Sequence, residues 1–159
     1  MALKNEDLHF DSKQELLKRF CAFQERANYD VKIKAKRIGM TAAETEQSIN
    51  LLTEQGFLDE RRYVEAFVRG KMKYNKWGKI KIRAELRAKS ISQTLIDEYI
   101  NAVDQDEYMD ILSTIISKKA LTLQANEHEK NLMKLERYAL SKGFEHDLVF
   151  KVVHEFLKV

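Results

Sequence analysis

The sequence contains no proline and only one cysteine in 159 residues. Proline is common in extended loops and edge strands, so its absence favours helices that are joined by short turns. A single thiol, that of Cys21, cannot form an internal disulfide, which indicates a reducing compartment. The sequence also lacks an apolar run of about 20 residues, the length of a membrane span. The first residues lack the apolar core of a secretory signal, so we expect a cytoplasmic protein without membrane contact.

Motifs for catalysis, nucleotide binding and metal binding are missing as well. Neither a G-x-x-x-x-G-K-[ST] loop nor a G-x-G-x-x-G loop occurs. The four histidines (His9, His128, His146 and His154) do not have the spacing of a metal site. Cys21 lies between apolar residues, which is typical of a buried, inert thiol. We therefore expect no enzyme activity, no cofactor and no bound metal.

Positive charge is concentrated in one part of the chain. The formal net charge is only +3, but the segment from Arg69 to Lys89 contains nine lysines and arginines and one acid, Glu85. Helices normally intersperse acidic residues that pair at i,i+4, and this basic segment has almost none. A solvated helix face is one interpretation of such a run. We favour the other interpretation, that the basic segment binds an external polyanion.

Helix signals dominate the remaining sequence. Two capping boxes, Ser12-Lys13-Gln14-Glu15 and Thr41-Ala42-Ala43-Glu44, predict the start of a helix. Gly56 predicts a left-handed C-cap, and Asp59 predicts the N-cap of the following helix. The predicted buried faces follow helical spacing and comprise Leu16, Phe20 and Phe23, then Thr45, Ile49 and Leu52, then Tyr63, Val64, Phe67 and Val68.

One segment carries conflicting signals. Apolar residues alternate strictly with polar ones across 79–89, which is a strand pattern, but the residue types are good helix formers. The neighbouring sequence offers no second strand that could satisfy the hydrogen bonds of this one. We predict a helix with Ile82 and Leu86 on its buried side. Ile80 and Ala84 then lie on another face.

The chain repeats itself at a period of about 50 residues. The segments 39–52, 90–103 and 143–156 align, with Gly39, Ser90 and Gly143 at equivalent positions. A period of this size predicts a helical array in which each unit covers the apolar face of its neighbour. We therefore predict an all-α fold of three tandem three-helix repeats that form an elongated, curved array. The predicted parts are an N-terminal tail (1–11), a first repeat (12–58), a second repeat (59–105) and a third repeat (106–159).

The region 56–91 resembles the signature region of the RecX family, which regulates the RecA recombinase. The matching residues are Gly56, Leu58-Asp59-Glu60, Tyr63, Phe67-Val68-Arg69, Gly78, Ile82-Arg83-Ala84-Glu85-Leu86 and Lys89-Ser90-Ile91. The family's three tandem three-helix repeats agree with the internal repeat. The family usually has glycine where this chain has Ser90. A serine in a left-handed turn costs about 1 kcal/mol, so we expect a different turn here.

The resemblance implies a regulatory protein without catalysis of its own. Proteins of this family lie in the groove of the RecA–single-stranded DNA filament and hinder filament growth, ATP hydrolysis and strand exchange in homologous recombination, DNA repair and the SOS response. By this interpretation the chain acts as a monomer whose partners are the RecA filament and single-stranded DNA. The residues predicted to contact the filament or its DNA are Arg69, Lys71, Lys73, Lys76, Trp77, Lys79, Lys81, Arg83 and Arg87.

Trp77 has two interpretations from sequence. It packs in the turn between two helices beside Gly78, or it stacks on a nucleobase or donates its indole N–H. Two alternative functions also stay open. One is a helix-turn-helix transcription regulator, although the third helices of the repeats are apolar and partly acidic, unlike a recognition helix. The other is a protein-interaction scaffold without DNA contact.

Overall fold

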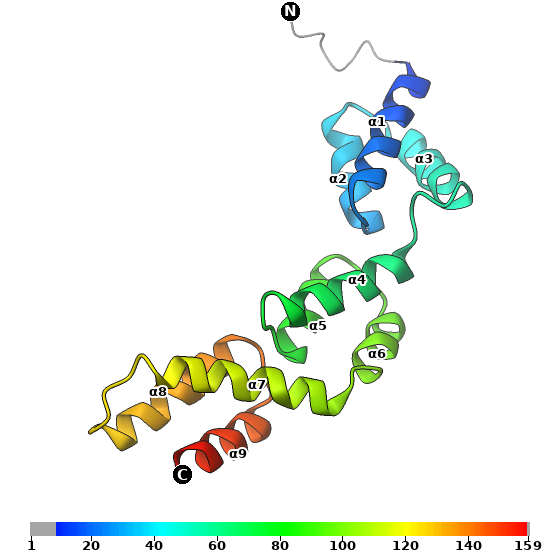
Figure 1. The fold of residues 1–159 in the computed structure, drawn as a ribbon. Helices are drawn as coiled ribbons and strands as arrows, with labels where there is room; N and C mark the ends of the chain where they lie inside the picture. The colour runs from blue at the N-terminus through cyan, green and yellow to red at the C-terminus, as the bar shows by residue number, and fades with distance from the viewer. Residues whose placement is uncertain (1–8, 159) are drawn as a thin grey trace, which may run out of the picture. The chain divides into compact units, whose positions relative to one another are not determined.

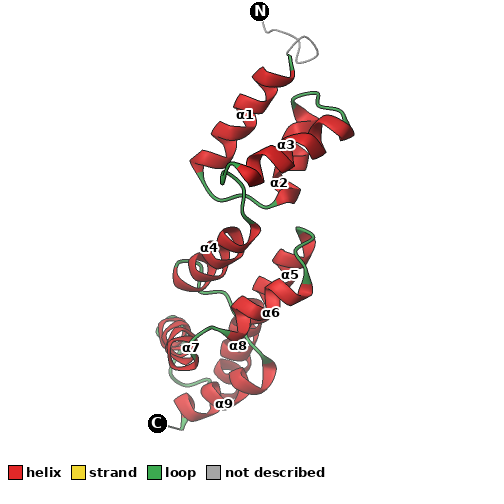
Figure 2. Ribbon diagram, turned by 90° about the vertical axis from the view of Figure 1, so that its right-hand side faces the viewer, coloured by secondary structure: helices red, strands yellow, loops and turns green. Residues whose placement is uncertain are grey.

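Every element of secondary structure in residues 9–158, the range that the computed structural model describes, is an α-helix (Figures 1 and 2). The helices of this range are α1 (Phe10–Phe23), α2 (Asn28–Arg37), α3 (Ala42–Glu54), α4 (Glu60–Lys73), α5 (Lys79–Ala88), α6 (Gln93–Asn101), α7 (Gln105–Ala120), α8 (His128–Ser141) and α9 (His146–Leu157). The predicted all-α class, with three helices in each of three repeats, is confirmed. Most of the predicted tail lies outside the described residues.

The three repeats share one turn geometry between their second and third helices. The aligned residues Gly39, Ser90 and Gly143 have positive φ angles of 79°, 59° and 92°. In each repeat the N-cap of the third helix follows two residues later, at Thr41, Ser92 and Glu145. The alignment found in the sequence therefore marks the same left-handed turn in all three repeats.

The expectation that Ser90 avoids a left-handed turn is wrong. Its φ of 59° lies in the same left-handed region as the equivalent glycines. The left-handed conformation of Ser90 belongs to the same turn as in the other two repeats. As in those repeats, the N-cap follows two residues later, at Ser92, which accepts a hydrogen bond from the backbone N–H of Leu95 at 3.3 Å. Serine thus adopts a conformation that costs an L-residue about 1 kcal/mol.

The chain divides into two compact units that do not coincide with the repeats. The first unit ends at Ala66 and also takes in Lys89–Ile91. The second unit comprises Phe67–Ala88 and the chain from Ser92 onwards. The core of the first unit includes the side chains of Leu17, Cys21, Val31, Ala35, Ile38, Ile49, Leu52 and Leu58.

The face that α1 buries differs from the predicted one. Leu17 and Cys21 are buried, whereas Leu16 is 36% and Phe23 84% exposed. The capping box at Ser12 is also wrong, because α1 begins at Phe10, so that Ser12 lies inside the helix. The stripe of residues that α1 buries in the core therefore lies one position later in the sequence than the predicted stripe.

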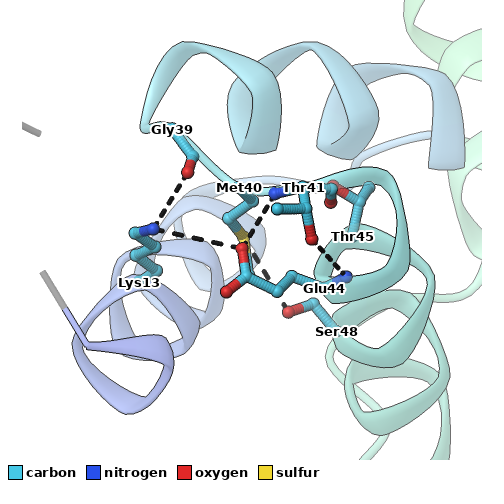
Figure 3. Close-up of polar contacts among 7 residues, drawn as sticks. All are labelled: Lys13, Gly39, Met40, Thr41, Glu44, Thr45 and Ser48. Carbon is cyan, nitrogen blue, oxygen red and sulfur yellow. Dashed lines mark hydrogen bonds and ion pairs between the residues drawn. The ribbon is translucent and has the colours of Figure 1, made fainter. Parts of the chain in front are cut away.

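The buried face of α1 also carries a lysine (Figure 3). Lys13 is 6% exposed, and its ammonium donates a hydrogen bond of 2.9 Å to the carbonyl of Gly39. The carboxylate of Glu44 lies 4.0 Å from the same ammonium. Glu44 also accepts from the backbone N–H of Thr41, whose hydroxyl accepts from the N–H of Glu44, so the predicted capping box at Thr41 is confirmed.

The helix signals around α4 and α5 are confirmed. Gly56 has a φ of 78° after α3, and Asp59 accepts hydrogen bonds from the backbone N–H groups of Arg61 and Arg62 at the start of α4. The region 79–89 forms helix α5 over Lys79–Ala88. Ile82 and Leu86 are fully buried, while Ile80 is 53% exposed on another face.

The second unit contains a backbone contact that only glycine allows. A Cβ on Gly78 would lie 2.3 Å from backbone atoms of Gly143 and Phe144. A Cβ on Gly143 would in turn lie 2.3 Å from the Cβ of Lys81. The start of α5 therefore packs directly on the turn between α8 and α9.

This contact also satisfies the backbone donors at the start of α5. The N–H of Gly78 donates to the carbonyl of Lys142 at 2.8 Å, and that of Ile80 donates to the carbonyl of Gly143 at 3.0 Å. The N–H of Lys79, between them, donates to the hydroxyl of Tyr108 at 3.0 Å. The third repeat thus supplies the acceptors that a capping side chain supplies at other helix starts.

We expect the substitution Gly78→Ala to lower the free energy of unfolding by about 1–3 kcal/mol, because the new Cβ meets backbone that cannot move aside. Gly70→Ala is the matched control, since a Cβ on Gly70 meets nothing within 4 Å. Gly70 lies inside α4, so alanine there should raise stability by about 0.5–1 kcal/mol. Urea unfolding of both variants measures the difference. A Gly78→Ala protein as stable as the Gly70→Ala protein would contradict the close contact.

Candidate polyanion-binding site

The basic segment comprises the end of α4, the loop that joins α4 to α5, and α5 itself. Lys76 in this loop has a positive φ of 56°, and the N–H of Trp77 donates to the carbonyl of Lys71 at 3.0 Å. The chain thereby turns back on the last turns of α4 before Gly78 meets the third repeat. The loop therefore joins two helix ends that both carry lysines, the end of α4 and the start of α5.

Two lysine side chains meet at the ring of Trp77. The Nζ atom of Lys71, from α4, lies 4.6 Å from the centre of the ring, and that of Lys81, from α5, lies 4.5 Å from it. Both distances are within the range of a cation–π interaction. Trp77 itself is half-buried between the two helices. It therefore packs at the helix junction and at the same time contacts two of the predicted site residues.

Lys79 contacts a second aromatic ring, that of Tyr108. Its Nζ atom lies 4.6 Å from the ring centre of Tyr108, while its backbone N–H donates to the hydroxyl of that tyrosine. The same hydroxyl donates to the carboxylate of Glu145 at 2.5 Å. Burial, and then the hydrogen bond to Glu145, raise the pKa of Tyr108. The tyrosine thus stays a neutral donor, and Lys79 is fixed at both its backbone and its side chain.

The two arginines of α5 have partners on α6 or at its start. Arg83 forms a hydrogen-bonded ion pair with Asp97. The Nε atom of Arg87 donates to the side-chain oxygen of Gln93 at 2.9 Å. The hydrogen bond from Arg83 lowers the pKa of Asp97 against the weaker, opposite effect of burial. Both arginines therefore serve the packing of α5 on α6 in this structure.

The remaining predicted residues lie at the end of α4 and in the loop. Lys73 is exposed and its Nζ atom lies 5.5 Å from the ring centre of Tyr74, which is 77% exposed. Lys76 is half-buried in the loop. Arg69 is exposed on α4 and makes an interaction within the chain.

Five lysines of the segment are without acidic partners. Among residues 9–158, no carboxylate oxygen lies within 4.0 Å of the ammonium groups of Lys71, Lys73, Lys76, Lys79 and Lys81. We call these five residues the lysine cluster. Their mutual repulsion is not relieved by acids, and four of the five instead contact aromatic rings. The lysine cluster is therefore the part of the basic segment best suited to bind an anion.

The described residues 9–158 also contain a single thiol and potential metal ligands. Cys21 is 5% exposed, and burial raises the pKa of its thiol to about 11 against the opposite effect of Arg26. The prediction of a buried thiol is confirmed, and a raised pKa lowers the fraction of reactive thiolate at neutral pH. In the described part of the chain, no three His, Cys, Asp or Glu side chains lie close enough together to hold a metal ion.

Sequence reasoning missed two residues that organise the site. Tyr108 follows Lys79 by 29 residues, and Asp97 follows Arg83 by 14. Neither separation is a local helix spacing, so no pattern in the sequence links these pairs. Asp97 is one of several acids that follow the basic segment, and nothing in the sequence marks it or Tyr108.

Comparison with known proteins shows which family the chain resembles. A model described as "RecX, second three-helix domain" matches residues 59–100, and one described as "RecX, third three-helix domain" matches residues 106–153. The chain belongs to the RecX family. The match to the second RecX domain covers the complete lysine cluster, together with Trp77, Arg83 and Asp97.

Individual relatives agree. "Regulatory protein RecX" of Clostridium tetani is 36% identical over 135 residues, which cover 84% of this chain and 60% of the relative. The protein of the same name from Chlorobium phaeobacteroides is 29% identical over 131 residues, covering 82% of this chain and 84% of the relative. The chain spans only 60% and 51% of the lengths of the C. tetani relative and one from Clostridium botulinum.

Solved RecX structures have the same fold. The crystal structure of RecX from Lactobacillus salivarius superposes with a TM-score of 0.82 at 18% identity, covering 94% of this chain and 97% of that one. A second structure, of a regulatory protein RecX, gives a TM-score of 0.80 at 20% identity over 94% of this chain and 72% of that one. Among the described residues no helix has both the length and the apolar character to cross a bilayer.

The Arg83–Asp97 pair predicts a pH-dependent difference in stability. A carboxyl group whose pKa is lowered by folding stabilises the fold above its ordinary pKa of about 3.9, and this contribution is lost as pH falls through the lowered value. We expect Asp97→Asn to be slightly less stable than the unmodified protein at pH 7. The difference should disappear in acid, where Asp97 is protonated.

Thermal unfolding between pH 7 and pH 2 measures this difference. Asp110→Asn is the matched control, because Asp110 is an exposed carboxylate of α7 that pairs with no described residue. It removes the same charge without an ion pair. If Asp97→Asn remained less stable than the unmodified protein by the same amount at the lowest pH, the ionised carboxylate of Asp97 would not be the source of the stabilisation.

Proposed function

We propose that this chain is a regulator, and specifically an inhibitor, of RecA-type recombinase filaments. In this proposal it binds in the groove of the RecA–single-stranded DNA filament as a cytoplasmic monomer, and it reduces ATP hydrolysis and strand exchange in DNA repair without catalysis of its own. Membership of the RecX family and relatives named "Regulatory protein RecX" support the regulatory role. The observation that carries the proposal for this chain is the lysine cluster.

The lysine cluster is suited to a filament that contains DNA. Its five ammonium groups come from two helices and the loop between them, and acids do not neutralise them. Phosphates of a single strand are the polyanion that a RecA-type filament offers. The helices outside the second repeat then supply further surface for contacts with protein. Arg83 and Arg87 have a smaller part in this proposal, because each has a partner within the chain.

The structure gives a specific reason to rank a helix-turn-helix repressor lower. Of the third helices, α3 and α6 contain no lysine or arginine, and α9 contains one, Lys151. A recognition helix in the major groove presents basic and polar side chains to the bases. The lysine cluster lies instead on α4, α5 and the loop between them.

We expect single-stranded DNA to bind with a log–log salt slope of about −2 to −3.5, which corresponds to three to five phosphate contacts. The triple variant Lys73→Glu, Lys76→Glu and Lys81→Glu should bind far more weakly, with a slope smaller in magnitude by about 2. Fluorescence anisotropy at several salt concentrations measures both quantities.

The matched control carries the same change of net charge elsewhere in the second unit. Lys118→Glu, Lys151→Glu and Lys158→Glu alter three lysines of α7, α9 and its C-cap. Equal losses of affinity in the two triple variants would mean that net charge, and not the lysine cluster, determines binding. Circular dichroism of both variants establishes that their helix content is unchanged.

The regulatory activity has its own test. Titrated into the cognate RecA-type recombinase on single-stranded DNA, the protein should suppress ATP hydrolysis well below one copy per recombinase subunit. Three repeats in series give one copy more than one surface, so a single copy can engage neighbouring subunits. The Lys73, Lys76 and Lys81 triple variant should need a higher concentration for the same suppression. No effect of the unmodified protein at equimolar concentration and low salt would defeat the proposal and favour a scaffold without DNA contact.

A further inference from the structure

The ring of Trp77 brings together two charges that should repel each other. The ammonium groups of Lys71 and Lys81 lie 4.6 Å and 4.5 Å from its centre, so their separation is at most about twice that distance. No carboxylate of the described residues lies within ion-pair distance of either one. Two cations held near one ring without an acid form an arrangement that an anion would complete.

We propose that Lys71, Trp77 and Lys81 form a site for a backbone phosphate, in which Trp77 is a positioning residue and not a base-stacking platform. The ring orients the two ammonium groups, and the ammonium groups bind the phosphodiester oxygens. This inference rests on the proposed function, since it specifies how the lysine cluster contacts a nucleic acid strand.

The surroundings of Trp77 favour this role over base stacking. Its backbone N–H donates to Lys71, and the next residue, Gly78, is fixed against Gly143 by the close backbone contact. The ring is half-buried, and the ammonium groups already interact with its π-system. A nucleobase that stacked on a face in contact with an ammonium would displace that ammonium and lose its interaction with the ring.

Positioning matters because lysine side chains are otherwise mobile. A free lysine loses much rotamer entropy when it binds a phosphate. Contacts with a fixed ring restrict the side chain before the ligand arrives, so less entropy is lost on binding. Lys79 repeats this arrangement on the ring of Tyr108, which is itself fixed by hydrogen bonds to Lys79 and Glu145.

Two oligonucleotides of equal length separate a positioning role from a stacking role. One is a thymidine strand, and the other is a fully abasic phosphodiester strand with the same number of phosphates. We expect the unmodified protein to bind both strands. Trp77→Leu should weaken binding to both by the same factor, about three- to tenfold. Its salt slope should be unchanged, because no charge is removed.

Each other outcome overturns the inference in a distinguishable way. A loss confined to the thymidine strand would establish stacking. Unchanged binding of both strands by Trp77→Leu would overturn the positioning role and leave the proposed function intact. Binding of neither strand by the unmodified protein would overturn both this inference and the DNA contact in the proposed function.

A second set of variants keeps the test decisive if Trp77→Leu does not fold. Trp77→Phe retains an aromatic ring at the helix junction and interacts more weakly with a cation. Combined with Lys81→Met in a double-mutant cycle, it measures whether the two residues act together. We expect Lys81→Met to lose less affinity for the abasic strand in the Trp77→Phe background than in the unmodified protein. Additive losses would show that the ring does not act through Lys81.

Discussion

The contact between the backbones of Gly78 and Gly143 determines where α5 begins and how it faces the third repeat. Two glycines are needed because a Cβ on either one would lie 2.3 Å from atoms across the contact. Once they meet, the N–H groups of Gly78 and Ile80 reach carbonyls of the α8–α9 turn, and that of Lys79 reaches Tyr108. The lysines at the start of α5 are therefore positioned by the third repeat, although they belong to the second.

The cations of the basic segment divide by chemistry as well as by position. The planar guanidinium of Arg83 suits the directed hydrogen bonds of an ion pair, and it is used inside the fold with Asp97. Arg87 donates a hydrogen bond to the neutral side chain of Gln93. The five residues of the lysine cluster, whose ammonium groups act as compact point charges, are not neutralised by acids among the described residues, and four of them contact aromatic rings. Lys89, at the end of the segment, instead pairs with Asp30. The nine positive residues of the basic segment thus include some that bind partners within the fold, such as Arg83 and Arg87, and others, the lysine cluster, that are available to a ligand.

Local signals in the sequence predicted much of the fold. The cap at Thr41, the left-handed C-cap at Gly56 and the helix at 79–89 follow from backbone chemistry that a short stretch of chain already contains. The left-handed turn at Ser90 does not, because serine disfavours that conformation. Helical spacing alone did not decide between neighbouring stripes on α1, where Leu17 is buried and Leu16 is exposed. Composition indicated the lysines of the candidate site. Their rings and the partner of Arg83 depend on residues brought together only by tertiary packing.

The two compact units have a consequence for how the protein can be cut into fragments. Helix α4 contributes its first residues to the first unit and its last residues to the second, and the chain returns to the first unit at Lys89–Ile91. There Lys89 binds Asp30 at 2.8 Å and lies over the ring of Tyr63. A fragment that ends at residue 58, the predicted end of the first repeat, would lack both Tyr63 and Lys89 and would leave Asp30 without its ion pair. An independently expressed domain would therefore have to follow the interleaved course of the chain.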